Sequence, residues 1–334
     1  MGKIYESITE LTGHTPLLHL ARYEKAHSLE ASIYAKLEFY NPNQSIKDRT
    51  AVSMIEAAER EGKIKPGDTL VEMTSGNTGI GVAAVAAAKG YKSRIFIQDD
   101  VSEERFASIR AFGGTTIKFM DDPFIKSVLG ETDMDFVKTI NRYEKEVLSK
   151  EKDLFFLNQD YNDANPSAHE TTTGPEIWED TDGQVDILVA GVGTGGTVSG
   201  LGRYLKKKNP DIQIVAVTPE LDSMKTAEHP EREEIIGLHP YDNVPVEEIQ
   251  TSMDINVVDE KFEITTEPAK ELVKEIALKE GIMVGTSSGG ALYAATEIAR
   301  REENKGKKIV VIFPDSGLRY LSTGLFDYEG VTGE

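Results

Sequence analysis

Patterns typical of strands and of helices alternate along most of this 334-residue chain. The stretch GDTLVEMTSGNTGIGVAAVAAAKG, residues 67–90, predicts a short strand, a loop of small polar residues and an alanine-rich helix. The same order recurs from VDILVAGV at residues 185–192 to IQIVAVTPE at residues 212–220, and again toward the end of the chain. This alternation predicts an α/β protein with a mainly parallel sheet, flanked by helices, in each half.

Charge and composition narrow the classes of partner. The formal net charge of −20, from 57 acidic and 37 basic residues, argues against nucleic acid and anionic membrane surfaces. The chain has no cysteine and its six histidines lack the spacing of a zinc motif, so we expect no metal. We regard the histidines as structural, with the exception of His239, which lies in the irregular segment beside Asp242. No apolar run approaches the ~20 residues of a membrane span, and the first residues do not form a signal peptide. We expect a cytoplasmic protein that acts on a small molecule.

Lys47 lies at the start of a predicted helix, directly after NPNQSI at residues 41–46. A cation in the first turn opposes the helix dipole, so this position favours the neutral amine over the charged form. A lowered pKa is what a lysine needs to form a Schiff base. The alternative is a solvent-facing lysine without a chemical role, which is the commoner situation for a single lysine.

The loop TSGNTG, residues 74–79, is a candidate site for an anion. It lies between a predicted strand and a helix N-terminus, where hydroxyls, an amide and glycine N–H groups suit a carboxylate or a phosphate. The alternative is an ordinary helix cap with a tight turn. Because six small polar residues exceed what a cap requires, we favour the anion site.

The loop GVGTGGTVSG, residues 191–200, follows a predicted buried strand and is a candidate phosphate site. Its glycines let the backbone wrap around a phosphate, and its threonines add hydroxyl donors at the start of a helix. The residues concerned are Gly193, Thr194, Gly195, Gly196 and Thr197. The loop also matches, through Gly191, Gly193 and Gly196, the fingerprint of nicotinamide enzymes, with Glu220 as the ribose-binding acid. That hypothesis leaves Lys47 and the TSGNTG loop without a role, so we rank it second.

The stretch GTSSGG, residues 285–290, has the Gly-x-Ser-x-Gly spacing of a nucleophile elbow, formed by Gly285, Ser287 and Gly289. In such hydrolases the catalytic histidine follows the serine, but no histidine occurs after His239. We therefore expect this loop and PDSG, residues 314–317, to supply further hydrogen-bond donors to a bound ligand.

A lysine that can be neutral, an anion loop, a separate phosphate loop and a serine after a late strand together describe a pyridoxal phosphate site. The chain resembles the cysteine synthase family, O-acetylserine sulfhydrylase with its cystathionine β-synthase relatives, which has the fold type II of tryptophan synthase β. The resemblance covers nearly the whole chain. It rests on TGHTPLLHL, NPNQSIKDRTA, TSGNTGIG, NPSAHETTTGPEIWEDTDGQVDILVAGVGTGGT and PDSGLRYLST.

The resemblance implies two domains and a homodimer. The N-terminal domain would comprise residues 36–157, with the Schiff-base lysine, the carboxylate loop and a mobile subdomain at about residues 85–135. The C-terminal domain would comprise residues 1–35 with 158–334 and would carry the phosphate loop.

The resemblance also implies a role for each motif residue. Lys47 would be the Schiff-base lysine and proton carrier, Asn77 would bind the ring oxygen of the cofactor, and Ser316 would face its pyridine nitrogen. The loop at residues 193–197 would hold the cofactor phosphate. The substrate carboxylate would be held by Thr74, Ser75, Gly76, Thr78 and Gln159.

Ser316 has a chemical consequence in this assignment. A serine does not hold a proton on the ring nitrogen as an aspartate does, so the ring withdraws electrons less strongly. Loss of a β-leaving group through an aminoacrylate is then favoured, and a nucleophile adds at the β-carbon. We expect cysteine synthesis from O-acetylserine and sulfide. If the neighbouring Asp315 met the nitrogen instead, this reasoning would fail.

The chain departs from the family pattern at positions expected to affect substrate choice. Met73 stands where proline is usual, and Asp160 stands where phenylalanine is usual. Tyr241 and Asp242 are more similar to the cystathionine β-synthase pattern, and Asp242 is a candidate catalytic residue that would activate water or position an amine. The alternative function is therefore a lyase or β-replacement enzyme that consumes cysteine and releases sulfide. A catalytically silent binding protein is the third class.

Overall fold

The computed structural model describes residues 4–129, 136–151, 153–225, 229, 231–241 and 251–327. Contacts divide the chain into two compact units, Met1–Thr12 with Lys47–Asn165 and Gly13–Ile46 with Pro166–Glu334. This division differs from the boundaries expected at residues 36 and 158. The first difference arises because β2 (Ser32–Leu37) pairs along its whole length with β10 (Lys308–Phe313), within the second unit.

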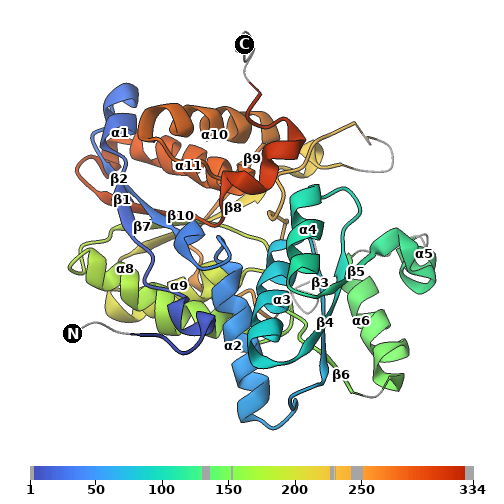
Figure 1. The fold of residues 1–334 in the computed structure, drawn as a ribbon. Coiled ribbons are helices and arrows are strands. Elements are labelled where there is room, and N and C mark those ends of the chain that lie inside the picture. Colours follow the sequence, from blue (N-terminus) through green and yellow to red (C-terminus); the bar gives the residue numbers. More distant parts are fainter. Residues whose placement is uncertain are drawn as a thin grey trace. The chain divides into compact units, whose positions relative to one another are not determined.

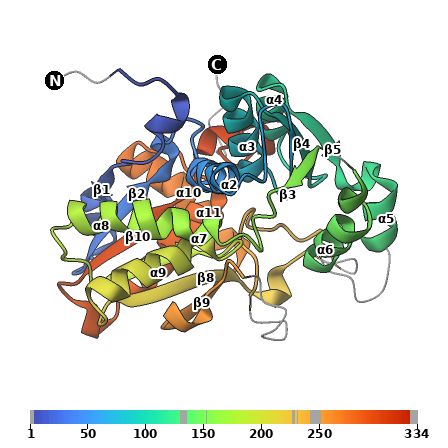
Figure 2. The ribbon, with the colours of Figure 1, turned by 90° about the horizontal axis from the view of Figure 1, so that it is seen from below.

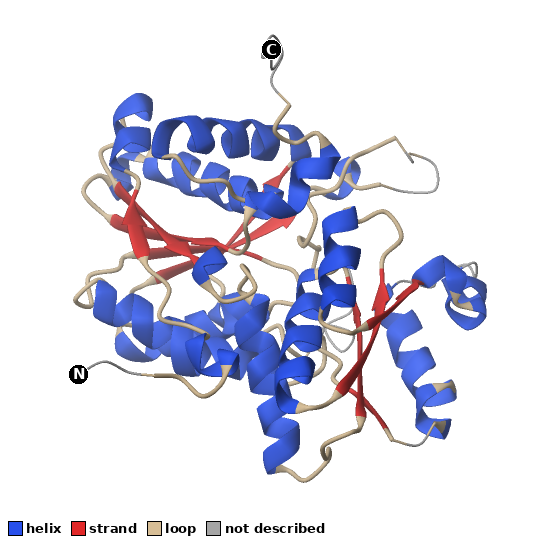
Figure 3. Ribbon diagram, viewed as in Figure 1, coloured by secondary structure: helices blue, strands red, loops and turns tan. Residues whose placement is uncertain are grey.

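Each unit has helices on both faces of a sheet, as Figures 1 and 3 show. The prediction of an α/β protein with mainly parallel sheets is therefore confirmed. Within the described part of the chain, no helix is both long enough and apolar enough to cross a membrane.

The first unit contains a parallel four-stranded sheet in the order β5-β4-β3-β6. Its strands are β3 (Thr69–Thr74), β4 (Lys92–Ile97), β5 (Thr115–Lys118) and β6 (Leu154–Phe156). One face is covered by α2 (Lys47–Arg60), α3 (Asn77–Lys89) and α4 (Glu103–Ala111). The other is covered by α5 (Pro123–Leu129) and α6 (Phe136–Glu146). Short 3-10 helices are η1 (Ile8–Leu11), η3 (Phe119–Asp121) and η4 (Leu148–Lys150).

Successive side chains of the central strands pack alternately against the helices on these two faces. Leu70 and Ile95 pack with the α2 and α3 face, whereas Val71, Met73 and Phe96 pack with the opposite face. Because successive side chains of a strand point to opposite faces, a strand covered on both faces reads as a continuous apolar run. β3 fits this rule except for one buried carboxylate, Glu72, which is described with the site.

The second unit contains a six-stranded sheet in the order β1-β2-β10-β7-β8-β9, parallel except for β1. Its other strands are β1 (Leu17–His19), β7 (Ile187–Gly191), β8 (Gln213–Pro219) and β9 (Glu260–Ile264). One face carries α1 (Ala21–His27), α10 (Thr266–Glu280) and α11 (Thr286–Ala299). The other carries α8 (Gly174–Asp180) and α9 (Gly196–Lys208), as Figure 2 shows.

Shorter elements complete this unit. α7 (Ala164–Ala168) contains the boundary between the units and continues into a π-helix, His169–Thr173. The 3-10 helices are η2 (Glu38–Tyr40), η6 (Leu221–Ser223), η8 (Ile255–Val257), η9 (Glu302–Asn304) and η10 (Gly317–Thr323).

The order of the strands brings the loops that carry the sequence motifs together, two in each unit. In the first unit, β3 and β6 are neighbours, so the loop after β3 and the segment after β6 leave the same edge of the sheet. In the second unit, β7 and β10 are neighbours, so the loops that follow them also share one edge. Ligands of parallel α/β sheets bind outside the carboxyl ends of the strands, which is where these four segments lie.

Candidate active site

Lys47 is the first residue of α2 and keeps partial solvent exposure. The helix is anchored in the core of the first unit by Ala51, Met54 and Ile55, which are fully buried. Burial of the amine lowers the pKa of Lys47, while the charges of Asp160 and Glu72 act in the opposite direction. The direction agrees with the expectation from the helix position, but its main cause is burial.

The TSGNTG loop joins β3 to α3. Gly76 precedes the helix with a φ of 134°, and a Cβ there would lie 2.2 Å from Cδ of Arg105. The Gly76 N–H donates to Oγ1 of Thr74 at 3.0 Å, which closes the turn. Asn77 begins α3 and Ser75 precedes Gly76, and both are half-buried. The loop therefore leaves backbone N–H groups of a helix N-terminus beside hydroxyl groups, as an anion requires.

Gln159 is brought to this loop by the pairing of β6 with β3. Thr78 Oγ1 donates to Oε1 of Gln159 at 2.6 Å, and Nε2 of Gln159 donates to the Met73 carbonyl at 3.3 Å. Both Thr78 and Gln159 are buried. The structure therefore joins two residues that are 81 positions apart in the chain and that were assigned to the same carboxylate site.

Two buried carboxyl groups belong to the same part of the first unit. Glu72 is 1% exposed; it accepts the Met73 N–H at 2.9 Å and the Gln159 N–H at 3.3 Å. Burial raises the pKa of Glu72 well above its usual value, and burial raises the pKa of Asp160 to about 6. Glu72 was not among the residues predicted from the sequence, although a charged residue inside a predicted buried strand is a usable signal.

The predicted phosphate loop lies between β7 and α9 in the second unit. Gly195 adopts a left-handed conformation with a φ of 83° immediately before the helix. A Cβ on Gly193 would lie 2.7 Å from the Gly237 carbonyl, and one on Gly195 would lie 2.5 Å from Sδ of Met253. The Gly196 N–H donates to Oγ1 of Thr194 at 3.3 Å. Close packing therefore requires glycine at residues 193 and 195, and the left-handed backbone conformation also favours glycine at residue 195.

Thr197 contacts His169, a histidine predicted to be structural. His169, which is fully buried in the π-helix, lies with Nε2 3.4 Å from Thr197 Oγ1 and with Nδ1 3.1 Å from Thr173 Oγ1. π-helical turns often occur at functional sites. His169 therefore supports the first turn of α9 from outside the predicted loop.

Ser316 follows β10 at the edge of the sheet shared with β7. Its Oγ accepts the Leu318 N–H at 3.2 Å and caps η10, and its side chain is largely buried. The neighbouring Asp315 accepts a 2.9 Å hydrogen bond from the Tyr320 hydroxyl. One oxygen of the Asp315 carboxylate, Oδ2, is therefore engaged within its own segment.

Asp242 lies outside the described residues. The segment before it is described, and the His239 N–H donates to the Val192 carbonyl at 2.7 Å, beside the phosphate loop.

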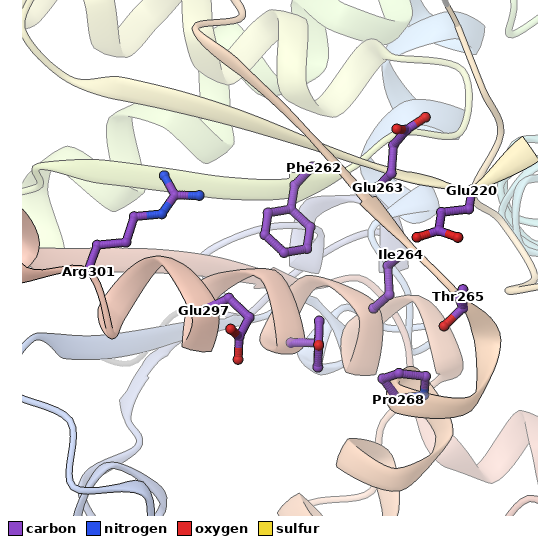
Figure 4. A pocket seen from close by; sticks show the side chains of 9 residues that line it. Glu220, Phe262, Glu263, Ile264, Thr265, Pro268, Glu297 and Arg301 are labelled. Atoms are coloured by element: carbon purple, nitrogen blue, oxygen red, sulfur yellow. The ribbon is translucent and has the colours of Figure 1, made fainter.

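The nicotinamide-enzyme and hydrolase hypotheses find weaker support in the structure. Glu220 lies after β8 and lines a pocket of about 490 Å³ with Phe262 and Arg301, as Figure 4 shows. No residue of the glycine loop at residues 191–200 lines this pocket, so the pocket does not join the two parts of a nicotinamide site. Ser287 lies in the first turn of α11, and only an isolated bridge at Val284 precedes it, so the strand of a nucleophile elbow is absent from this described segment. Among the described residues there is also no group of histidine and carboxylate side chains able to hold a metal ion.

Comparison with known proteins identifies relatives of the whole chain. A family model described as pyridoxal-phosphate dependent enzyme matches residues 8–315. A cysteine synthase from Staphylococcus aureus (strain Mu50) is 40% identical over 328 residues, which cover 98% of this chain and 99% of the relative.

Two solved structures have the same fold over nearly the whole chain. O-acetyl serine sulfhydrylase isoform 3 from Entamoeba histolytica has a TM-score of 0.81 and 35% identity, covering 99% of this chain and 94% of that one. A hydrogen sulfide-producing enzyme from Fusobacterium nucleatum has a TM-score of 0.79 and 34% identity, covering 95% and 100%. The chain therefore belongs to the pyridoxal-phosphate dependent enzymes, within the group that includes the cysteine synthases.

Proposed function

We propose that this chain is a transferase of amino-acid biosynthesis that forms cysteine and acetate from O-acetylserine and sulfide, with pyridoxal 5'-phosphate as its cofactor. The observation that carries the proposal is the 40% identity to a cysteine synthase over 98% of the chain. The hydrogen-bonded pair of Thr78 and Gln159 supports it independently, because it holds two residues of the expected carboxylate site together at one edge of the first unit.

The residues of the chain fit this cofactor. The glycine loop at residues 193–197 packs so closely that a Cβ at Gly193 or Gly195 would clash, and its N–H groups precede a helix, as a phosphate site requires. Lys47 has a lowered pKa, which suits covalent attachment of a carbonyl group. Asn77 and Ser316 would orient the ring through its oxygen and its nitrogen.

Bound pyridoxal phosphate supplies electron withdrawal that acidifies the α-proton of the amino acid. Thr74, Ser75, Gly76, Thr78 and Gln159 would hold the substrate carboxylate and fix the orientation of the Cα–H bond. Lys47 Nζ would accept that proton. The hydrogen bond from Tyr320 to Asp315 supports Ser316 as the residue at the ring nitrogen, because it engages Oδ2 of the competing carboxylate.

The proposal extends to a homodimer in the cytoplasm, with closure of a subdomain at about residues 85–135 over the substrate. Asp242 is assigned a part in substrate choice near the nucleophile. Size-exclusion chromatography with light scattering tests the dimer, and hydrogen exchange with and without a bound amino acid tests closure of residues 85–135.

The first experiment compares two reactions of one preparation of the purified protein. Cysteine formation from O-acetylserine and sulfide is expected to exceed sulfide release from L-cysteine. Faster sulfide release would contradict the proposal and favour the cysteine-consuming alternative. Asp242→Asn is then the variant that asks whether this residue distinguishes the two substrates.

A lysine replacement tests the cofactor assignment. Lys47→Ala is expected to lose the visible absorbance of the bound cofactor together with turnover. The matched control is Lys92→Ala, which changes an exposed lysine at the start of β4 in the same unit. Retained visible absorbance in Lys47→Ala would contradict the assignment.

A further inference from the structure

Lys47, Glu72 and Asp160 form a cluster of ionisable groups from three segments of the first unit. Lys47 begins α2, Glu72 lies in β3 and Asp160 follows β6. The two carboxyl groups are 1% and 4% exposed. The charges of both act on Lys47, and the charge of Asp160 also acts on Glu72.

A chain of hydrogen bonds holds the Asp160 segment beside the first turn of α2. Thr50, three residues after Lys47, donates from Oγ1 to Oδ1 of Asn165 at 3.3 Å. Nδ2 of Asn165, which is fully buried, donates to the carbonyl of Gln159 at 2.9 Å. Because residues three apart lie on the same side of a helix, this chain of contacts fixes the backbone at Asp160 on the side of α2 that carries Lys47.

The two carboxyl groups are held differently. Glu72 accepts two backbone N–H groups and is fixed within the sheet. Burial keeps its pKa well above the usual value, and the charge of Asp160 raises it further. Burial raises the pKa of Asp160 only to about 6, because the charge of Lys47 opposes the shift. With a pKa of about 6, Asp160 is mainly ionised at neutral pH, whereas burial favours the protonated form of Glu72.

We propose that Asp160 is the counter-charge of Lys47, a positioning residue that stabilises the ammonium form of the lysine after it has accepted the α-proton of the substrate. In this step the Cα–H bond breaks, its electron pair remains on the substrate side and an N–H bond forms at Lys47 Nζ. The new positive charge then faces the Asp160 carboxylate in a poorly solvated environment, where a charge pair is stronger than in water. The inference rests on the proposed function only in assigning the proton transfer to Lys47.

Exchange of the α-proton of L-alanine in D2O, followed by NMR, measures this step directly. L-alanine has no leaving group, so the exchange does not depend on which β-substituent or nucleophile the enzyme uses. Asp160→Asn is expected to slow the exchange roughly tenfold, which is the effect of lowering the pKa of the base by about one unit. Asp160→Glu, which keeps the charge, is expected to recover most of the rate.

Two controls separate this effect from a structural one. The visible absorbance of the bound cofactor shows whether Asp160→Asn is correctly folded. Asp163→Asn removes an exposed carboxylate three residues later and is expected to leave the exchange unchanged. In the unmodified chain, the rate should also fall as the pH decreases through about 6, where Asp160 takes up a proton.

The outcomes are distinguishable. A cofactor-loaded Asp160→Asn that exchanges at the parent rate would overturn the inference, as would equal losses in the Asn and Glu variants or a parent rate that is flat around pH 6. A parent chain that exchanges no α-proton would overturn it too. A parent that exchanges but forms no cysteine would instead contradict the proposed function and leave the assignment of Asp160 intact.

Discussion

Replacing Gly289 with alanine is expected to destabilise the second unit, whereas the same change at the adjacent Gly290 is not. Both glycines are buried in α11, and α11 packs against α10. A Cβ on Gly289 would lie 2.0 Å from the carbonyl oxygen of Ala269 and 2.8 Å from Cγ2 of Val273. A Cβ on Gly290 would have its nearest neighbour, Cδ1 of Leu238, at 3.6 Å, which is an ordinary contact.

The magnitude follows from these distances. Relief of a 2.0 Å contact with a backbone oxygen requires the helices to separate by about 1 Å. Overpacking of this kind costs about 1–3 kcal/mol, which exceeds the gain of up to ~1 kcal/mol from replacing glycine by alanine in a helix. Gly289→Ala is therefore expected to lose about 2 kcal/mol of unfolding free energy, and Gly290→Ala to gain up to ~1 kcal/mol.

Thermal unfolding followed by circular dichroism, at equal cofactor loading, measures the difference. For a unit of this size, ~1 kcal/mol shifts the midpoint by roughly 2–4 °C, so Gly289→Ala should unfold about 4–8 °C below the parent. Gly290→Ala should unfold at the parent temperature or slightly above it. Equal midpoints for the two variants would refute the packing argument.

Three further predictions concern the site. Thr78→Val should raise the KM for the amino acid. It should also lower the unfolding free energy measured in urea by about 1–3 kcal/mol, because the Gln159 amide oxygen loses its 2.6 Å hydrogen bond. Thr78→Ser, which keeps the hydroxyl, should behave as the parent. Asp160 has a folded pKa of about 6, above its unfolded value, so its contribution to stability decreases as the pH rises from about 4 through 6. In the cofactor-free chain, the unfolding free energy of Asp160→Asn, measured in urea, should accordingly increase relative to the parent as the pH rises from about 4 to 7, by up to ~3 kcal/mol, and a constant difference would contradict this. Gly200→Ala would place a Cβ 2.1 Å from the Pro166 carbonyl in α7 and 2.8 Å from Cβ of His169 in the π-helix, so cofactor retention after dialysis should fall; full retention would contradict the tight packing of α9 on α7 and the π-helix.

Local pattern predicted much of the fold because strand and helix periods are short-range properties. The starts of α3 at Asn77 and α9 at Gly196 coincide with the loops predicted as anion sites, since small residues and glycines mark where a strand changes into a helix. Lys47 likewise begins α2, as its position after an Asn-Pro turn indicated. The pyridoxal-phosphate family, predicted from the motifs, is confirmed by the comparisons.

Interactions between distant segments were not predictable in the same way. Glu72 interrupts an apolar strand, but only the fold shows that its carboxyl group binds the backbone of Gln159. His169 carried no motif of its own, and its contact with Thr197 depends on how the π-helix packs against α9. The Gly-x-Ser-x-Gly pattern around Ser287 was ambiguous in the sequence, whereas in the structure Gly289 is explained by the close approach of α10.

The sequence by itself determined the α/β class, the residue types at each strand end and the family, because these depend on local periodicity and on motifs of adjacent residues. The tertiary structure alone decided which distant groups share one environment. Asp160 departs from the family pattern, in which phenylalanine is usual at this position. Its pKa of about 6, however, arises from burial near Lys47 and Glu72, which are 113 and 88 positions away in the chain. Burial and Coulomb interactions depend on distance in space, and only the folded chain sets that distance.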